Sequence, residues 1–228
     1  MRLHHVVESQ QFTVPLLMGL FDRTRRICEL CAGQRVLDMG CCAHGDPDKL
    51  EPEEFLHGAI KQTAREVVGL DNDREAIESL GRRGFPVVEG DAEHLSADRL
   101  GLFDVVVAGE LIEHLSNPGL FLDGARRLLN PGGLLVATVP NAWSFTRLKQ
   151  LYKGVDDEKW THSQHTCWYS KATIRFLFER HGFQVKELGF CLPWQSDRWL
   201  KRMRDRVRFG WALRPEFSES VFIVGQRK

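Results

Sequence analysis

The chain has 228 residues, which is enough for one sizeable α/β core and too short for two ordinary catalytic domains joined by a linker. Hydrophobic residues make up 43% and charged residues 27% of it, a composition that excludes a disordered or fibrous protein. Lys and Arg together number 31, and so do Asp and Glu, so no net charge draws the molecule to nucleic acid or to an anionic membrane. Nucleic acid is therefore not expected as a partner, and any attraction of this kind must be local.

The N-terminal segment is interrupted by a polar run at residues 8–11 and lacks the apolar region and cleavage site of a signal peptide. No stretch of the sequence reaches the roughly 18 apolar residues that a membrane-spanning helix needs. The six cysteines are too few for a disulfide scaffold, so we expect a cytoplasmic protein in which most of them are buried thiols. Cys28 and Cys31 form a CxxC, but Cys41 and Cys42 are adjacent and lie inside another motif, which disfavours a zinc site of four thiolates.

The predicted elements begin with one or two helices over Val14–Cys31, which carry a broken apolar stripe. Between Val36 and Val139, short β-branched runs alternate with amphipathic stretches, a pattern typical of βαβ units and a parallel sheet. Strands are predicted over residues 35–39, 66–71, 86–90, 103–109 and 133–139. Helices between them are predicted over residues 51–65, 73–84 and 118–130. Gly84 and the turn at residues 130–133 end the second and third of these helices.

The rest of the chain is predicted to cover and complete this sheet. Residues 142–169 are polar and aromatic with weak periodicity, which indicates a lid. A helix over residues 172–181, capped by Ser170, and strands over residues 182–190 and 218–224 follow. The predicted fold class is therefore α/β: a Rossmann-like, doubly wound and mostly parallel sheet with helices on both faces, N-terminal helices and a lid insertion.

The most informative segment is VLDMGCCAHGD, residues 36–46, in which a predicted strand runs into a turn with Gly40 and Gly45. Glycine lets a backbone approach a ligand closely, and the next helix presents free N–H groups at its N-terminus. The second strand ends at Asp71, whose carboxylate can accept hydrogen bonds from both hydroxyls of a ribose. The third is followed by Asp91, where a carboxylate can bind the amino group of an adenine. These positions predict a nucleotide cofactor at the carboxyl edge of the sheet.

At these residues the chain resembles the class I S-adenosylmethionine-dependent methyltransferases. The likeness continues through FDVVVAGELIEHLSNPGLFLDGARRLLNPGGLLVATVPN and, more loosely, through HSQHTCWYSKATIRFLFERHGFQV. The resemblance implies S-adenosylmethionine as cofactor and a seven-stranded sheet whose last strand is antiparallel. It implies one methyltransferase domain over residues 1–228, made of a helical cap (1–33), a cofactor-binding core (34–141), the lid (142–169) and C-terminal helices and strands (170–228).

The resemblance also implies where the cofactor binds. Asp38 and Gly40 would hold the methionine end, Asp71 the ribose, and Asp91 with Ala92 the adenine. The full set of implied cofactor contacts is Asp38, Gly40, Cys42, Gly45, Asp71, Asn72, Asp91, Ala92 and Glu110. The chain departs from the family at Cys42 and His44, where glycine is usual.

Two alternatives concern the cofactor and the activity. Rossmann-type NAD enzymes also place an acidic residue at the end of the second strand, so Asp71 alone does not separate the two classes. Gly90 with Asp91 after the third strand, and the long ELIEHL segment after the fourth, favour the methyl donor. A relative that binds the cofactor without catalysis is the second alternative, because a fold does not by itself secure an activity.

The residues just beyond the fourth predicted strand carry the candidate chemistry. A sulfonium is already an activated methyl donor, so the enzyme has to align the acceptor, exclude water and, for a hydroxyl, remove a proton. The spacing of Glu110, Glu113 and His114 places them on one face of a helical turn toward the cofactor. We predict that His114 is the general base and that Glu113 orients it, since an imidazole titrates near neutral pH. The alternative is that Glu110 contacts the cofactor and the Glu113–His114 pair only fastens the turn.

The same ExxEH pattern also resembles the metal site of the small-RNA 3′-terminal 2′-O-methyltransferases, in which two glutamates and a histidine are joined by a distant histidine. Here His162 or His165 would supply the fourth ligand. Many metal-free relatives carry similar residues, and the lid histidines precede an aromatic strip suited to covering an acceptor. We therefore predict a site without metal, with a metal-dependent RNA 2′-O-methyltransferase as the alternative.

Aromatic residues outside the predicted core indicate an acceptor side, since aromatic faces stack on flat rings and sugars, although packing of the lid explains them equally well. These residues are Trp143, Phe145, Tyr152, Trp160, Trp168, Tyr169, Trp194 and Trp199.

Residues 198–208 hold six basic residues and one acidic residue, a net charge of +5 that suits a phosphate group or contact with a membrane surface. The segments PNAWSFTRL and HSQHTCWYS resemble ubiquinone-biosynthesis-like, polysaccharide and natural-product O-methyltransferases. We predict a hydroxylated small-molecule or glycan-type acceptor. If the basic stretch binds the acceptor, that acceptor carries a phosphate. The predicted lid and substrate residues are His162, His165 and Trp168.

Overall fold

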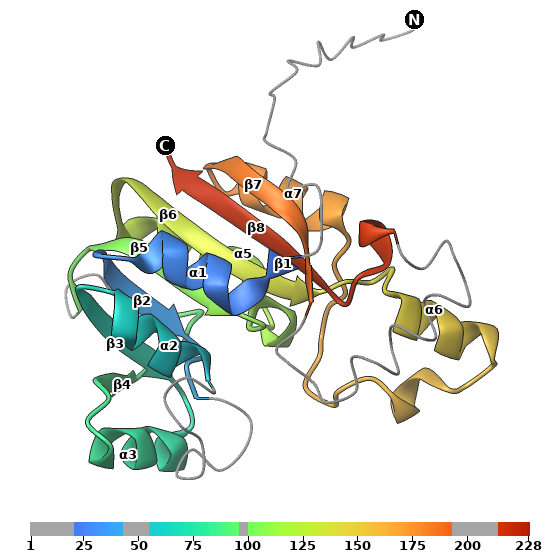
Figure 1. Ribbon diagram of the computed structural model, residues 1–228, viewed down its shortest axis with the longest axis horizontal. Coiled ribbons are helices and arrows are strands. Elements are labelled where there is room, and N and C mark those ends of the chain that lie inside the picture. The colour runs from blue at the N-terminus through green and yellow to red at the C-terminus, as the bar shows by residue number, and fades with distance from the viewer. Residues whose placement is uncertain (1–20, 43–54, 96–99, 193–213) are drawn as a thin grey trace, which may run out of the picture.

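The computed structural model describes residues 21–42, 55–95, 100–192 and 214–228. Within these ranges, eight strands form one sheet in the order β1-β7-β8-β6-β5-β2-β3-β4 (Figure 1). The strands are β1 (Phe21–Asp22), β2 (Arg35–Met39), β3 (Glu66–Asp71), β4 (Val87–Glu89), β5 (Phe103–Gly109), β6 (Leu129–Pro140), β7 (Phe183–Leu192) and β8 (Ser220–Arg227). The α-helices are α1 (Arg23–Cys31), α2 (Leu56–Thr63), α3 (Arg74–Arg82), α5 (Pro118–Leu128), α6 (Phe145–Tyr152) and α7 (Lys171–Arg180). The described ranges also hold three short 3-10 helices, η3 (Ile112–His114), η4 (Asp157–Lys159) and η6 (Pro215–Phe217).

The sheet is the expected seven-stranded one, extended at one edge by the two residues of β1. β8 runs antiparallel to β6 and β7, and the other neighbouring strands are parallel. Of the one or two helices predicted over Val14–Cys31, α1 is confirmed, and residues 14–20 lie outside the described residues. The prediction is wrong at Phe21–Asp22, which pairs with Cys191 and Leu192 at the end of β7. The reason is that the free edge of β7 presents backbone N–H and C=O groups that need hydrogen-bond partners. An extended segment can supply these partners, whereas a helix cannot.

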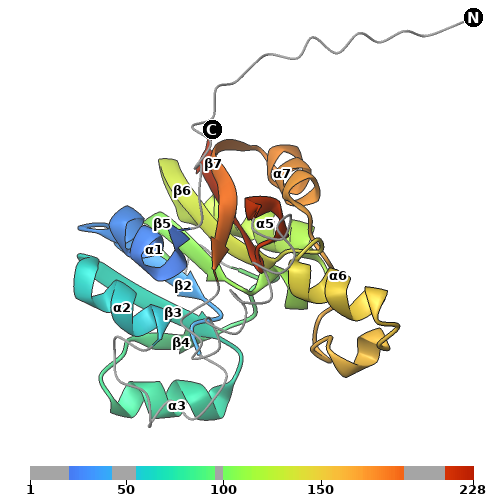
Figure 2. The ribbon, with the colours of Figure 1, turned by 45° about the vertical axis from the view of Figure 1, so that its right-hand side comes forward.

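Helices cover both faces of the sheet, and alternate residues of the central strands face the two sides (Figures 1 and 2). On β5, Val105 and Val107 pack in the core beneath α1 and α2, whereas Val106 and Ala108 pack in the core beneath α5 and α7. Strands buried on both faces have near-continuous apolar sequences. The observed bounds of β2, β3 and β5 therefore agree with the predicted ones.

Local capping explains where two of the helices begin and end. The Asp73 carboxylate accepts a hydrogen bond from the Ala76 amide at 3.1 Å and starts α3, which ends before Gly84 at φ +78°. Ser170 caps α7 in a capping box with Thr173, as the sequence predicts for this helix.

The third predicted helix ends earlier than expected. α5 stops at Leu128, and the predicted turn at residues 130–133 lies within β6, with a shift of register against β5. The cause is a long-range contact, because the Asn130 side chain donates a hydrogen bond to Asp104 of β5 at 2.9 Å. The prediction of helix over Leu129 and Asn130 is therefore wrong.

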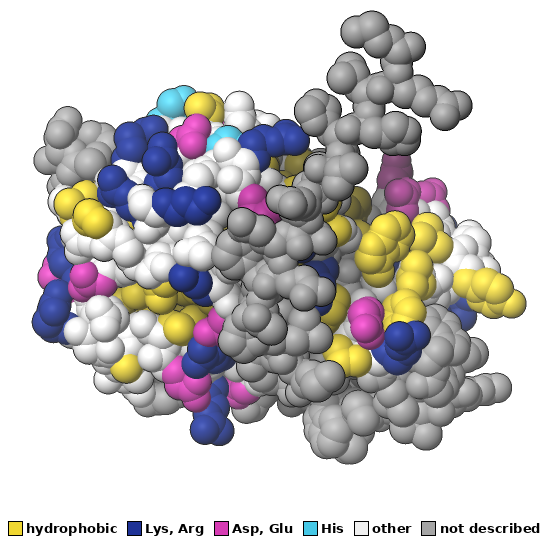
Figure 3. All heavy atoms as spheres, turned by 90° about the horizontal axis from the view of Figure 1, so that it is seen from above, with side chains coloured by type: hydrophobic (Ala, Val, Ile, Leu, Met, Phe, Trp, Pro, Cys, Tyr) yellow, Lys and Arg dark blue, Asp and Glu magenta, His cyan; other side chains and the backbone are white. Residues whose placement is uncertain are grey.

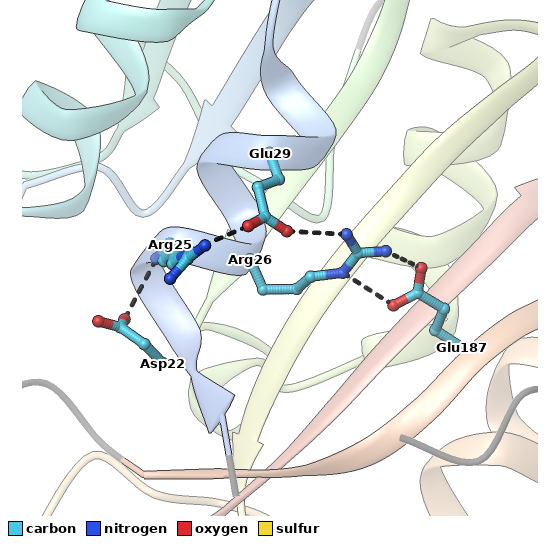
Figure 4. Close-up of polar contacts among 5 residues, drawn as sticks. All are labelled: Asp22, Arg25, Arg26, Glu29 and Glu187. Carbon is cyan, nitrogen blue, oxygen red and sulfur yellow. Dashed lines mark hydrogen bonds and ion pairs between the residues drawn. The ribbon is translucent and has the colours of Figure 1, made fainter. Parts of the chain in front are cut away.

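Ion pairs fasten the N-terminal helix to the far edge of the sheet (Figure 4). On α1, Arg26 binds Glu187 of β7 through Nε at 3.1 Å and Glu29 of its own helix through Nη1 at 3.0 Å. The Asp22 carboxylate caps the helix by accepting a hydrogen bond from the Arg25 amide at 3.2 Å. These contacts fix the first turn of α1, which begins beside the ends of the central strands.

The predicted lid contains α6 and η4 at one end of the molecule (Figures 1 and 2). Several of its apolar side chains face solvent: Tyr152 is 94% exposed, and Trp143 and Leu151 are exposed as well. Figure 3 shows hydrophobic side chains gathered at the end of the molecule that carries α6. None of the helices in the described ranges has the length and apolarity needed to cross a membrane.

Candidate active site

A cavity of about 380 Å³ opens where the parallel neighbours β2 and β5 end. Its lining residues are Arg23, Asp38, Gly40, Cys41, Cys42, Phe55, Leu56, Gly109, Glu110, Glu113, His114, His162 and His165. The structure thus brings these predicted site residues together: Asp38, Gly40, Cys42, Glu110, Glu113, His114, His162 and His165. Four predicted cofactor residues, Asp71, Asn72, Asp91 and Ala92, and the lid residue Trp168 are not among the lining residues.

The turn after β2 needs a glycine at its first residue. Gly40 has φ +69°, a left-handed conformation that side chains rarely adopt, and an added Cβ would lie 3.2 Å from the Leu111 side chain. Its amide donates a hydrogen bond to Leu70 at 2.9 Å. The backbone of this turn can therefore lie close to a ligand in the cavity. Gly45 and His44 lie outside the described residues, and so do the basic stretch at residues 198–208 and Trp194 and Trp199.

Asp71 is held rigidly at the end of β3. One carboxylate oxygen accepts a hydrogen bond from the Cys42 amide at 2.9 Å, and the other accepts from the amides of Asn72 at 2.8 Å and Asp73 at 3.1 Å. Backbone donors of this kind fix the direction of a carboxylate. Asp71 thereby links the turn after β2 to the end of β3, while its half-exposed side chain stays accessible to a ligand.

Asp91 and Ala92 follow β4, farther along the same edge of the sheet. The Asp91 carboxylate accepts a hydrogen bond from the Glu93 amide at 2.8 Å and contacts Nδ1 of His94 at 2.7 Å. These two contacts, the amide first, lower the pKa of Asp91, so its exposed carboxyl is charged. Ala92 is nearly buried, at 9% exposure, and lies in the hydrophobic core.

The cysteines do not form the four-thiolate group considered from the sequence. Cys41 and Cys42 each offer a sulfur within 4.8 Å of an Asp71 carboxylate oxygen, and all six thiols are free. A hydrogen bond to Cys42 and burial both raise the pKa of Cys41, which disfavours the thiolate that a metal would bind.

Two residues at the cavity, one in its lining and one behind it, belong to none of the sequence motifs. Arg23, at the start of α1, lines the cavity with a buried Nε that has no hydrogen-bond partner in the described residues. Gly109 makes room for it, because a Cβ there would lie 2.5 Å from Arg23 Nη2. His57 of α2 lies behind the cavity wall and contacts Asp38 Oδ2 at 3.0 Å. Both positions depend on how helices pack on the sheet, which no local pattern in the sequence reports.

The chain turns sharply after β5, where Glu110 takes a left-handed backbone conformation with φ +64°. It is the one non-glycine residue in the described ranges with this conformation, which costs about 1–3 kcal/mol and recurs at functional sites. The helical turn predicted to follow is a single 3-10 turn, η3, whose Ile112 and Glu113 are buried. This turn places Glu110, Glu113 and His114 on the cavity.

Glu113 is a buried acid beside two other titratable groups. Burial raises its pKa to about 9, and the negative charge of Glu110 adds to this shift. Its Oε1 lies 3.9 Å from Nε2 of His114, longer than a hydrogen bond. At neutral pH the Glu113 carboxyl is therefore protonated next to the imidazole.

Hydrogen bonds fasten the lid segment to η3. The Thr166 hydroxyl donates to the Leu115 carbonyl at 2.7 Å, and its amide donates to the Glu113 carbonyl at 2.8 Å. The end of the lid segment, just before α7, is thereby held beside the cavity. These contacts join residues that are 51 and 53 positions apart in the chain.

Three histidines meet at this point. The ring centroid of His114 lies 5.7 Å from that of His162 and 4.7 Å from that of His165. One nitrogen from each ring lies within 4.8 Å of the others. Trp168 continues the cluster, with its ring 5.3 Å from His165 and the Arg147 guanidinium 4.1 Å above it. The lid therefore adds imidazole and aromatic groups to the side of the cavity that carries His114.

Comparison with known proteins identifies the class. The family model described as a methyltransferase domain matches residues 16–188. A probable S-adenosylmethionine-dependent methyltransferase of Mycolicibacterium smegmatis is 30% identical over 167 residues, which are 72% of this chain and only 57% of that protein. A ubiquinone biosynthesis O-methyltransferase of Azorhizobium caulinodans is 32% identical over 224 residues, which cover 94% of this chain and 80% of that protein. The crystal structure of a SAM-dependent methyltransferase from Archaeoglobus fulgidus superposes with a TM-score of 0.61 at 21% identity, covering 90% of this chain and 91% of that one.

The chain therefore belongs to the methyltransferase domain family. It is an S-adenosylmethionine-dependent methyltransferase with the Rossmann-like class I fold, and S-adenosylmethionine is its methyl donor. This assignment decides between the methyl donor and NAD, which Asp71 alone could not do.

Proposed function

We propose that this methyltransferase transfers the methyl group to a hydroxyl of a small-molecule acceptor, with His114 as general base. The observation that carries the proposal is that His114 lines the same cavity as Asp38 and Gly40, the residues of the predicted cofactor turn. A hydroxyl must lose its proton as the methyl group arrives, and an imidazole is suited to take it at neutral pH. The likeness to a ubiquinone biosynthesis O-methyltransferase over 94% of the chain supports oxygen as the methylated atom.

In this proposal the cofactor lies across the carboxyl ends of β2, β3 and β4. Asp38 binds the α-ammonium group of the methionine portion, and the Arg23 guanidinium, which lines the cavity, binds its carboxylate. Asp71 accepts hydrogen bonds from the ribose, and Asp91 and Ala92 bind the adenine. Gly40, Cys42, Gly45, Asn72 and Glu110 complete the proposed contacts.

The proposed base has a stabilising neighbour. When His114 takes the hydroxyl proton, it becomes a cation. The charge of Glu110, which adds to the raised pKa of Glu113, also favours a protonated imidazole nearby. Glu113 Oε1 lies 3.9 Å from Nε2 of His114, so Glu113 positions the imidazole by contact rather than by a direct hydrogen bond.

The proposed acceptor binds between the cofactor and the lid. His162, His165 and Trp168 would cover it, which suits a flat ring or a sugar-bearing hydroxyl. Residues 198–208 would contact a phosphate on the acceptor or a membrane surface. A cytoplasmic location remains a prediction from the sequence.

The test is methyl transfer from labelled S-adenosylmethionine to a panel of phenols, catechols and sugar-bearing alcohols, with and without phosphate, read by mass spectrometry. An O-methyl product supports the proposal. Transfer only to amines or thiols would overturn the assignment to oxygen. Tight binding of S-adenosylhomocysteine with no transfer to any member would favour a catalytically silent protein.

A metal-assisted reaction is the second candidate, and the convergence of His114, His162 and His165 favours it. Three imidazole nitrogens with a side open to a cavity are a donor set that zinc, iron or manganese accepts, so the residues fit such an ion. A metal held there would orient and polarise the acceptor hydroxyl. Metal analysis of tag-free protein, followed by a chelator and add-back assay that includes an RNA 3′ end, separates the candidates. One bound equivalent whose removal stops transfer supports the metal, whereas unchanged transfer supports His114 as base alone.

A further inference from the structure

His57 is a fully buried histidine beside the cofactor cavity, in a position that no sequence motif marks. It lies on α2 with 0% exposure, and its Nδ1 is 3.0 Å from Oδ2 of Asp38. Asp38 is itself 1% exposed and lines the cavity. The pair therefore connects α2 to the wall of the cavity through one buried hydrogen bond.

Close packing holds the ring of His57 in this position. Its centroid lies 5.7 Å from that of Phe85. Gly69 of β3 leaves the space that the ring needs, because an added Cβ would lie 3.0 Å from His57 Cε1 and 2.6 Å from Cys41 Sγ. The other nitrogen, Nε2, is buried and has no hydrogen-bond partner in the described ranges. The ring is thus fixed by apolar contacts on several sides and by Asp38 on one.

The contact between the two side chains fixes how Asp38 faces the cavity. Nδ1–H of the His57 ring can donate to Oδ2 of Asp38, which occupies one acceptor position of the carboxylate and leaves the others for a ligand. Because the ring cannot move in its packed surroundings, this bond holds the carboxylate in one direction at the cavity wall.

We propose that His57 is a positioning residue that holds Asp38 as an oriented anion for the α-ammonium group of the cofactor's methionine portion. This inference rests on the proposed placement of that group at Asp38. If His57 only filled space, its loss would disturb every ligand of the cavity alike. If it positions Asp38, its loss selectively weakens ligands that carry the ammonium group.

The experiment compares two ligands by calorimetry: S-adenosylhomocysteine, which carries the amino acid portion, and 5′-methylthioadenosine, which keeps the adenine and ribose and lacks that portion. For His57→Leu we expect the affinity for S-adenosylhomocysteine to fall by about tenfold or more, as for a lost charge-assisted contact, and that for methylthioadenosine by less than about twofold. Asp38→Asn should give the same pattern, and the double variant should be no weaker than either single one.

Two further variants make the test specific. His57→Asn keeps a donor near the position of Nδ1 and should recover most of the affinity, whereas His57→Gln lacks it and should not. The Gln variant also replaces His57→Leu if the latter does not fold. His181→Leu is the control, because His181 Nδ1 lies 3.0 Å from Asp123 in a similar pair that does not line the cavity. We expect this control to leave the ratio of the two affinities unchanged.

Equal weakening of both ligands by the folded His57 variants, or no weakening of either, would overturn the inference while leaving the cofactor site in place. Failure of the wild-type protein to bind either ligand is a different outcome. It would overturn the proposed cofactor placement, and the inference with it.

Discussion

The two sides of the cavity are formed by different kinds of structural element. On the proposed cofactor side, Gly40 directly follows β2 and Asp71 is the last residue of β3, and backbone hydrogen bonds fix both. On the acceptor side, His114 stands on a 3-10 turn, and His162 and His165 come from a lid segment. In the proposed function the sheet itself therefore positions the cofactor, whereas hydrogen bonds from the lid segment to Glu113 and Leu115 position the acceptor groups. Altering the lid segment should then change the acceptor preference without disturbing the cofactor site.

The largest expected effect comes from breaking the acceptor side alone. His114→Ala should lower turnover by ~10²-fold or more, because general-base catalysis commonly contributes that much. Its affinity for S-adenosylhomocysteine should stay near the wild-type value, since the proposed cofactor contacts are elsewhere. Steady-state kinetics with an acceptor from the panel, together with calorimetry, check both parts. Wild-type turnover near neutral pH in this variant would exclude His114 as the base.

Breaking the cofactor side should give the opposite pattern. Asp71→Ala should weaken binding of S-adenosylhomocysteine by about 1 to 3 kcal/mol, the range for a lost charge-assisted hydrogen bond. The control is Asp73→Ala, two residues on, which removes the cap of α3 and should lower stability with little change in affinity. Calorimetry in which the two variants bind equally well, or in which NAD binds tightly to the wild type, would contradict the assignment of Asp71.

A smaller effect is expected where α1 is fastened to the sheet. Glu187→Gln removes the ion pair with Arg26 and should lower the free energy of unfolding by about 1 kcal/mol or less, because the pair is partly exposed. Since α1 carries Arg23, cofactor affinity should also fall slightly. Glu66→Gln is the matched control, because its ion pair with Arg35 does not line the cavity. Equal cofactor affinities in the two variants would show that fastening α1 does not matter for Arg23.

The last expected effect concerns stability rather than binding or turnover, and it is a pH dependence from Glu113. Its pKa is raised in the folded protein, by burial and then by Glu110, so unfolding releases its proton and rising pH favours the unfolded state. Wild-type stability should therefore fall, relative to Glu113→Gln, as pH rises from the ordinary carboxyl range of about 4 toward about 9. Denaturant unfolding at several pH values measures the difference. Parallel stability profiles for the two proteins would show that Glu113 is not protonated in the fold.

The sequence predicts the ends of the central strands better than the packing of helices on the sheet, for a physical reason. Strands such as β5 are buried on both faces, so their apolar runs are visible, and Gly40 and Asp71 stand at fixed offsets from strand ends. Arg23 and His57 reach the cavity only because helices distant in sequence pack on the sheet, which Gly109 and Gly69 permit. The spacing of residues along the chain does not show which helices will pack beside the cavity.

The acceptor side shows the same limit in another form. The pattern of Glu110, Glu113 and His114 predicts a shared face, and all three line the cavity. The sequence does not predict the 3-10 geometry of the turn, or the burial that raises the pKa of Glu113. It also does not show that Thr166 would fasten the lid to this turn and gather three imidazoles.

The most direct test of a cavity divided into cofactor and acceptor sides is a crystal structure of the protein with S-adenosylhomocysteine. We expect the adenosine at Asp71 and Asp91, the amino acid portion at Asp38 and Arg23, and the sulfur directed toward His114. A ligand bound with its sulfur directed away from His114, or bound outside the cavity, would contradict the account.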